Sequence, residues 1–155
     1  MKILVIEDAY GKWETVAAVL QRVLPTAEVH RARDLFEGER EIAQPGWDLL
    51  VLDMSLDIRT GAGRAAAAHD FTGGLKIVGR MYYDELEVPT IILTGFDSFP
   101  TTRTNGDGVM MGLESVEAEA TRKLGDHLIG LVRYLSDGWE ERFEALLQRF
   151  RGETE

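Results

Sequence analysis

The segment Leu49-Leu50-Val51-Leu52-Asp53, four apolar residues ending on a carboxylate, constrains the fold of this chain more than any other feature. Such a short apolar run predicts a strand buried on both faces, which is typical of parallel sheets covered by helices. In open α/β sheets, ligands bind beyond the carboxyl ends of the strands. We therefore expect a rigid strand to hold Asp53 at the edge of a crevice. One such acid alone would more often only meet solvent.

Strand patterns recur along the chain and alternate with helical patterns. Strands are predicted over residues 2–6, 27–32, 48–52, 88–93 and 127–135. Apolar residues at helical spacing predict helices over 13–24, 34–43, 75–82, 109–124 and 136–151, with Pro25 ending the first, Ser136 capping the last and Gly152 ending it. The core-facing residues predicted for the second and third helices are Leu35, Phe36, Ile42, Ala43, Leu75, Val78, Met81 and Tyr82.

This alternation predicts an α/β fold, a doubly wound five-stranded parallel sheet of flavodoxin-like order 2-1-3-4-5 with helices on both faces. We expect one domain over residues 1–152 and a short C-terminal tail at 153–155. Residues 56–74 and 96–108 are predicted to be long loops, the first with one helical turn at the alanine run 65–68. Compact domains rarely carry such loops without a functional reason.

Composition excludes several classes of protein. The chain has no cysteine, so it has neither disulfides nor thiol chemistry. A formal net charge of −10 argues against a nucleic-acid partner, because binding to a phosphate backbone rests on lysine and arginine. Neither a membrane-spanning run nor a signal-peptide pattern is present in the sequence, so we expect a cytoplasmic protein without membrane contact.

Five residues are predicted to meet where the strand order reverses, between strands one and three. Glu7, Asp8 and Asp53 would bring three mutually repelling carboxylates together, and hard oxygen ligands of this kind suit Mg²⁺. Thr94 would add a hydroxyl from the end of strand four, and Arg133 a cation from strand five. A metal, a carboxylate nucleophile, a hydroxyl donor and a cation are the components of phosphoryl transfer.

These segments resemble the response-regulator receiver domain of two-component signalling. The matching segments are residues 3–8, 48–53, 89–95 and the strand that ends in Arg133. The resemblance implies a stand-alone receiver that accepts a phosphoryl group with Mg²⁺ and signals through protein–protein contacts. It would not be an enzyme beyond self-directed phosphotransfer and autodephosphorylation. Its partners would be a histidine kinase or phosphotransfer protein, a downstream protein, and a second copy docked on the face of helix four, strand five and helix five.

The resemblance also implies a role for each site residue. Asp53 would be the phosphoacceptor and, with Asp8, a direct metal ligand. Glu7 would act on the metal through water, and the backbone carbonyl of Ser55 would complete the protein ligands. Thr94 would be the switch hydroxyl and would bind phosphate together with Arg133.

The sequence departs from the family pattern at three places. The family has a lysine followed by proline where this chain has Arg133 and Tyr134, and arginine is not an equivalent replacement. Lys123 would supply the amine if the strand register differed. The loop 56–74 is extended and lacks the usual proline, and the segment between Thr94 and strand five is long.

Two other functions remain open from the sequence. One is a phosphorylation-independent pseudo-receiver, the same fold used as a constitutive interaction module, which the arginine and the two long loops favour. The other is a metal-dependent phosphatase or nucleotidyl-transfer domain, as in toprim and haloacid-dehalogenase-like proteins, but Ser55 stands where their second acid is required. The sequence lacks P-loop glycine spacing at Gly11-Lys12, and its histidines lack zinc-ligand spacing.

Overall fold

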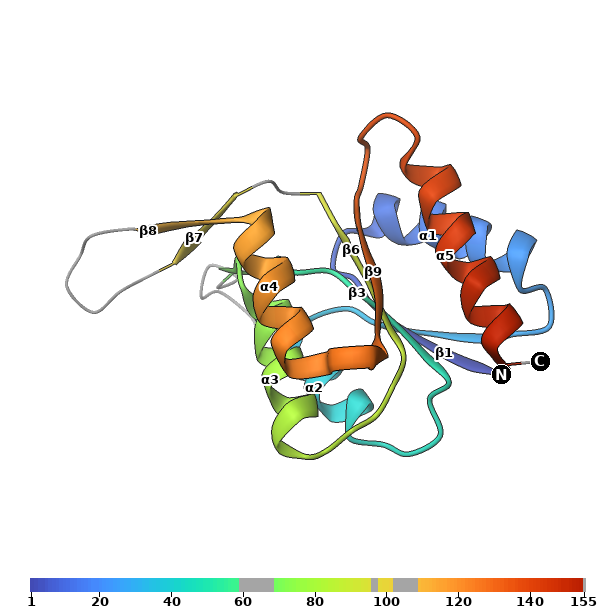
Figure 1. Ribbon diagram of the computed structural model, residues 1–155, viewed down its shortest axis with the longest axis horizontal. Helices are drawn as coiled ribbons and strands as arrows, with labels where there is room; N and C mark the ends of the chain where they lie inside the picture. The colour runs from blue at the N-terminus through green and yellow to red at the C-terminus, as the bar shows by residue number, and fades with distance from the viewer. Residues whose placement is uncertain (59–68, 96–97, 102–108, 155) are drawn as a thin grey trace.

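A five-stranded parallel sheet forms the centre of the protein (Figure 1). The structure is a computed structural model that describes residues 1–58, 69–95, 98–101 and 109–154. The sheet has the order β2-β1-β3-β6-β9, which confirms the predicted topology. Its strands are β1 (Lys2–Ile6), β2 (Glu28–Ala32), β3 (Leu49–Leu52), β6 (Thr90–Thr94) and β9 (Leu128–Arg133).

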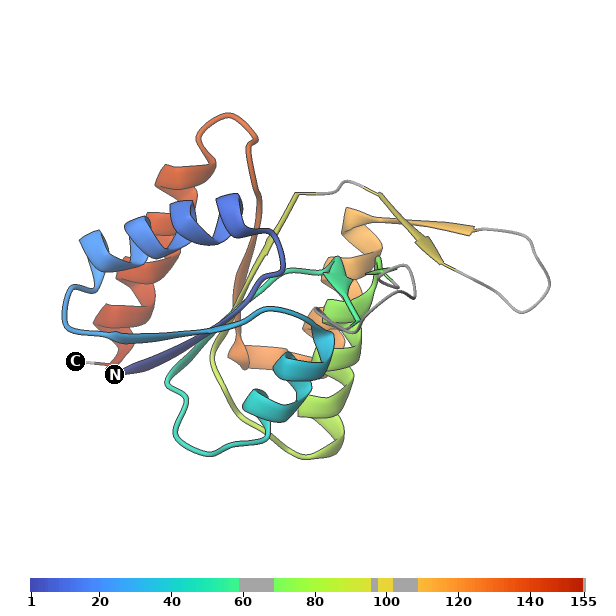
Figure 2. The ribbon, with the colours of Figure 1, turned by 180° about the vertical axis from the view of Figure 1, so that it is seen from behind.

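Helices cover both faces of this sheet (Figures 1 and 2). One face carries α1 (Tyr10–Val23) and α5 (Trp139–Thr154), and the other carries α2 (Leu35–Ile42), α3 (Gly73–Tyr83) and α4 (Leu113–Leu124). Alternate residues of β3 enter the two cores: Leu49 and Val51 pack under α1 and α5, while Leu50 and Leu52 pack under the other three helices. Each buried side chain of this size contributes about 1.5–3 kcal/mol, so β3 is firmly held up to Asp53.

Two helix ends agree with their sequence signals, whereas both ends of the last helix do not. α1 ends before Pro25, and the Asp34 carboxylate caps α2 by accepting from the Glu37 amide at 2.7 Å. The prediction that Ser136 caps the last helix was wrong, because α5 begins at Trp139 and the Ser136 hydroxyl donates instead to the Arg133 carbonyl at 2.6 Å. α5 continues to Thr154, so the prediction that Gly152 ends it was wrong.

Three residues predicted to face the core are exposed instead, namely Phe36, Ala43 and Tyr82. In α2 the cause is its eight-residue length and its close approach to β1. A Cβ at Gly38 would lie 2.9 Å from the Ile6 side chain, so a glycine forms the centre of the contact face and Phe36 points outward.

The two long segments contain short strands that the sequence analysis did not predict. β4 (Leu56–Asp57) pairs antiparallel with β5 (His69–Asp70), and β7 (Ser98–Thr101) pairs antiparallel with β8 (Val109–Gly112). The pair β7–β8 projects from the body of the fold (Figure 1). The prediction of a helix from residue 109 was therefore wrong at its start, because pairing with β7 makes 109–112 a strand. The alanine run 65–68 lies outside the described residues.

A short 3₁₀ turn, η1 (Gly125–His127), joins α4 to β9. It occupies the first residue of the predicted strand 127–135, and the strand itself ends at Arg133. In the described part of the chain, no helix combines the length and the apolar character needed to cross a bilayer.

Candidate functional site

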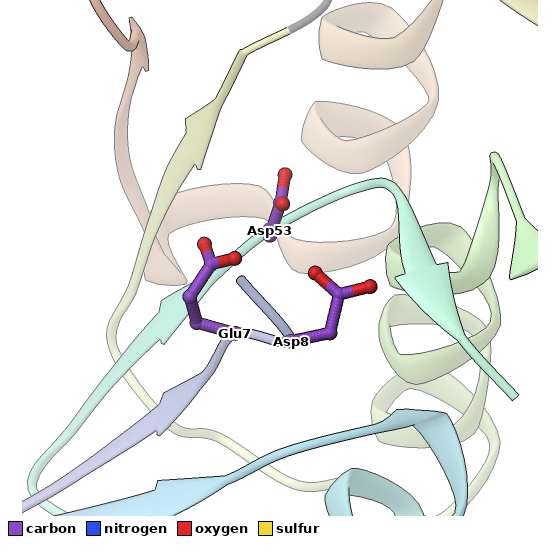
Figure 3. A group of neighbouring side chains, drawn as sticks. All are labelled: Glu7, Asp8 and Asp53. Carbon is purple, nitrogen blue, oxygen red and sulfur yellow. The ribbon is translucent and has the colours of Figure 1, made fainter. Parts of the chain in front are cut away.

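Three carboxylates meet at the carboxyl ends of β1 and β3. Glu7 and Asp8 directly follow β1, and Asp53 directly follows β3 (Figure 3). One carboxylate oxygen from each residue lies within 4.8 Å of the other two. The predicted convergence at the point where the strand order reverses is therefore present, and this set of oxygens could hold a metal ion.

Burial makes the negative charge of this group costly. Glu7 is 2% exposed and Asp53 is 6% exposed, whereas Asp8 is half-buried and forms the open side of the group. Burial, together with repulsion from Asp53, raises the pKa of Glu7 to about 7 although Lys12 opposes the shift. Such a group is stabilised by positive charge placed among its oxygens.

Lys12 supplies part of that charge, and the sequence analysis did not assign it to the site. Its Nζ atom lies 2.6 Å from Glu7 Oε2 and 3.0 Å from Asp53 Oδ2. Nζ also donates to the backbone carbonyl of Leu93, in β6, at 2.7 Å. The buried ammonium therefore connects the acidic ends of β1 and β3 to the neighbouring strand.

The phase of α1 explains why Lys12 reaches the crevice. Lys12 belongs to the buried stripe of this helix together with Val16, Val19, Leu20 and Val23. It stands one turn before Val16, in the first turn of the helix that follows Glu7 and Asp8. A lysine in line with an apolar stripe, at the end of the helix nearest two acids, is the signal that could have identified it.

The backbone after Asp53 is tied to both acidic segments. The Met54 amide donates to Asp53 Oδ1 at 2.7 Å, and the Asp57 amide donates to Asp8 Oδ2 at 2.7 Å. Ser55, whose carbonyl was predicted to bind the metal, is buried between these two anchors. The segment that carries the expected backbone ligand is thus fixed to the acids on either side.

The start of α3 packs directly against this segment. The Gly74 amide donates to the Met54 carbonyl at 2.9 Å. A Cβ atom at Gly74 would lie 2.4 Å from the Asp53 carbonyl oxygen and 2.4 Å from the Met54 side chain. Only a glycine allows α3 to begin so close to the backbone of Asp53.

Arg31 fixes the backbone of the acidic pair, and it too was not predicted. Its guanidinium donates to the Glu7 carbonyl and to the Asp8 carbonyl, each at 3.0 Å. The same guanidinium lies 5.7 Å from the Tyr10 ring centre and 5.6 Å from that of Trp13. Arg31 thereby joins β2 to the backbone of the acidic pair and to the start of α1.

The predicted hydroxyl and the predicted cation end neighbouring strands. Thr94 closes β6 and is fully buried, and its hydroxyl has no hydrogen-bond partner among the described residues. Arg133 closes β9 in register with Thr94, and its side chain is exposed. Tyr134 follows, with its amide 2.8 Å from the Thr94 carbonyl and its ring centre 5.4 Å from Lys12 Nζ. Lys12 is thus the cation that the structure places on Asp53.

Lys123, the alternative source of an amine, lies at the opposite end of the strands from the carboxylates. Its ammonium pairs with Glu119 at 3.1 Å in the last turns of α4. It lines a hollow of about 680 Å³ together with Tyr82 and His127. His127 immediately precedes β9, so this hollow is at the amino ends of the strands and the Lys123 alternative was wrong.

The charges of the group are consistent with one bound divalent ion. When all three acids are ionised, the three carboxylates and the Lys12 ammonium together carry two negative charges in excess. A hard divalent cation with oxygen ligands would neutralise them. Within the described residues, this is the one place where three acidic side chains gather closely enough for such an ion.

Comparison with solved structures identifies the fold, whereas no family model and no curated protein matches the chain. A receiver protein from Pseudoalteromonas atlantica aligns at a TM-score of 0.66 with 8% identity, over 100% of both chains. A CheY-like receiver domain from Methanospirillum hungatei aligns at 0.61 with 15% identity, over 98% of this chain and 97% of that one. The HemR receiver domain from Leptospira biflexa aligns at 0.61 with 21% identity, over 96% and 92%. The protein has the receiver-domain fold.

Proposed function

We propose that this protein is a response-regulator receiver that accepts a phosphoryl group on Asp53 in the presence of Mg²⁺. The observation that supports it most is the convergence of Glu7, Asp8 and Asp53 at the strand ends of a receiver fold. The donor would be the phosphohistidine of a kinase or phosphotransfer protein. The output would be contact with a downstream protein, not catalysis on another substrate.

The transfer itself requires few groups from the protein. An Asp53 carboxylate oxygen forms a bond to phosphorus while the bond from phosphorus to the donor nitrogen breaks, and the electron pair leaves with the imidazole. Asp8, Asp53 and the Ser55 carbonyl would hold Mg²⁺, with Glu7 acting through water, and the ion would neutralise charge on the phosphoryl oxygens. The Met54 amide, bound to Asp53 Oδ1 at 2.7 Å, orients the nucleophile.

The Thr94 hydroxyl, which has no hydrogen-bond partner in the described part of the chain, provides a way to sense the new group. A buried polar group without a partner costs about 1–3 kcal/mol, and phosphoryl oxygens on Asp53 would offer it strong acceptors. Movement of Thr94 would be passed to β9, because the Tyr134 amide is bound to the Thr94 carbonyl. β9 is an edge strand between α4 and α5, and this face is where we place the contact with a partner or a second copy (Figure 1).

Labelling by acetyl phosphate tests the proposal. The native chain with Mg²⁺ is expected to gain one phosphoryl group in intact-protein mass spectra, and chelation of the metal should prevent it. Asp53→Asn should remain unlabelled, whereas Asp84→Asn, a change in an exposed acid at the end of α3, should label normally. The native chain staying unlabelled in Mg²⁺ would contradict the proposal.

The second candidate function is the phosphorylation-independent pseudo-receiver. The contact that favours it is Lys12, which already pairs with both Glu7 and Asp53. An unlabelled native chain would therefore make a constitutive interaction module the better explanation of the same fold.

A further inference from the structure

We propose that Lys12, carried by helix α1, is the residue that binds the phosphoryl group on Asp53. This inference rests on the proposed phosphoacceptor function. It assigns to the first helix a contact that the sequence analysis had assigned to Arg133 at the end of β9.

The hydrogen bonds of the ammonium suit this role. Lys12 Nζ has three acceptors, Glu7 Oε2, Asp53 Oδ2 and the Leu93 carbonyl, at 2.6, 3.0 and 2.7 Å. Once Asp53 carries a phosphoryl group, its own oxygens lose negative charge and the phosphoryl oxygens gain it. The ammonium then exchanges Asp53 Oδ2 for a phosphoryl oxygen, while Glu7 and Leu93 keep it in place.

Lys12 and Asp8 are held by different neighbours of Asp53. Asp8 is bound to the Asp57 amide in the segment that follows Asp53, whereas Lys12 is bound to the Leu93 carbonyl in β6. The ammonium therefore leaves the half-buried side of Asp8 to a divalent ion. The ion and the ammonium would then share the charge of one phosphoryl group.

Tyr134 confines the ammonium to this position. Its ring centre lies 5.4 Å from Lys12 Nζ, within the range of a cation–π contact. The same ring packs edge-on against Trp139, with centres 4.8 Å apart. With these neighbours the Lys12 side chain is only 7% exposed. The ammonium is therefore already positioned and loses little conformational entropy when it binds a phosphoryl group.

The location of Arg133 favours Lys12 over it. Arg133 is the last residue of β9 and its side chain is exposed, whereas Lys12 is buried with its ammonium on Asp53. An interaction in a site that excludes water is stronger than one at the surface. The charge that receiver sequences carry at the position of Arg133, at the end of β9, is thus supplied here from another element.

Titration with beryllofluoride, which mimics the aspartyl phosphate, tests the inference in the intact chain. With Mg²⁺ present, Lys12→Met is expected to weaken beryllofluoride binding by at least about tenfold, the effect of losing one charge-assisted hydrogen bond. Lys12→Gln, whose amide can still donate to the Leu93 carbonyl, should show the same loss because it lacks the charge. Arg133→Ala should stay within about threefold of the native chain, since a surface charge contributes little.

Mg²⁺ binding without beryllofluoride separates this role from a merely structural one. In both Lys12 variants the affinity for Mg²⁺ should be equal to or higher than in the native chain, because a competing positive charge has left Glu7 and Asp53. A variant that fails to fold would lose this binding. If Lys12→Met fails to fold, the test is decided by Lys12→Gln, whose folding is checked by its thermal unfolding curve.

The outcomes distinguish failure of the inference from failure of the proposed function. Native affinity for beryllofluoride in a folded Lys12→Gln chain would overturn the role of Lys12 and leave Asp53 as phosphoacceptor. Loss of binding in Arg133→Ala alone would restore Arg133 as the phosphate-binding cation. A native chain that binds no beryllofluoride at any Mg²⁺ concentration would overturn both proposals.

Discussion

The buried ammonium of Lys12 changes the electrostatics of the acidic crevice. One carboxylate oxygen from each of the three acids lies within 4.8 Å of the other two, so the acids repel one another at the strand ends. With the ammonium in place, two of them share a charge-assisted hydrogen bond to the same nitrogen. The site is therefore organised around one buried cation shared by two acids before any ligand arrives.

Thr94→Val should stabilise the protein and disable its switch. The hydroxyl is fully buried without a partner among the described residues, so valine removes a desolvated polar group at nearly constant volume. We expect the free energy of unfolding in urea to rise by about 1 kcal/mol. Most substitutions in a protein core lower this free energy instead. Labelling of Asp53 should persist, and a loss of stability would show that the hydroxyl has a partner in solution.

For the individual residues of the site, the sequence analysis predicted the positions of the acids but not of the cation that binds them. Glu7, Asp8 and Asp53 could be placed because residues that follow neighbouring parallel strands share one edge. Lys12 and Arg31 could not be placed from strand ends alone, since their reach depends on the phase of α1 and on the pairing of β2 with β1.

Helix α3 positions the segment after Asp53 by approaching it without a side chain in between. Gly74→Ala should therefore destabilise the protein by about 1–3 kcal/mol and slow the labelling of Asp53, because its Cβ would overlap the Asp53 carbonyl oxygen. Thermal unfolding and acetyl phosphate labelling measure the two effects.

Gly79 is the matched control within the same helix. A Cβ there would meet only Lys123 Nζ, at an ordinary 3.5 Å. Gly79→Ala should leave labelling unchanged and stabilise α3 by about 0.5–1 kcal/mol through helix propensity. Equal behaviour of the two alanine variants would contradict the role assigned to the start of α3.

Prediction of the helices and strands was limited in the same way, because contacts between distant segments leave no local signal in the sequence. Strands with continuous apolar runs were found because burial on both faces leaves a local signature. The pairs β4–β5 and β7–β8 were missed because each strand is only two to four residues long and is defined by its partner. α4 consequently begins at Leu113, not at residue 109.

Across the whole molecule, aromatic contacts lead from the crevice to α5. Tyr134 faces Lys12 on one side and Trp139 on the other, and the Trp139 ring stacks on Phe143 with centres 6.5 Å apart. Phe143 is fully buried in the core beneath α1 and α5. A change at Asp53 that moves Lys12 or Thr94 should therefore alter the surroundings of Trp139 at the start of α5.

Tryptophan fluorescence tests this connection. Beryllofluoride with Mg²⁺ should change the emission of the native chain, and Trp139→Phe should remove most of that change. Trp47→Phe is the control, because Trp47 is bound to the Glu41 carbonyl at 2.7 Å beside α2, away from the crevice. A response that survives in Trp139→Phe and disappears in Trp47→Phe would refute the route through Tyr134.

Borohydride trapping tests the central claim, phosphorylation of Asp53, most directly. Borohydride reduces an aspartyl phosphate to homoserine, so peptide sequencing after acetyl phosphate and Mg²⁺ reports which carboxylate was modified. Homoserine at position 53, absent when the metal is chelated, is the predicted result. Unmodified Asp53, or homoserine at another acid, would contradict the claim.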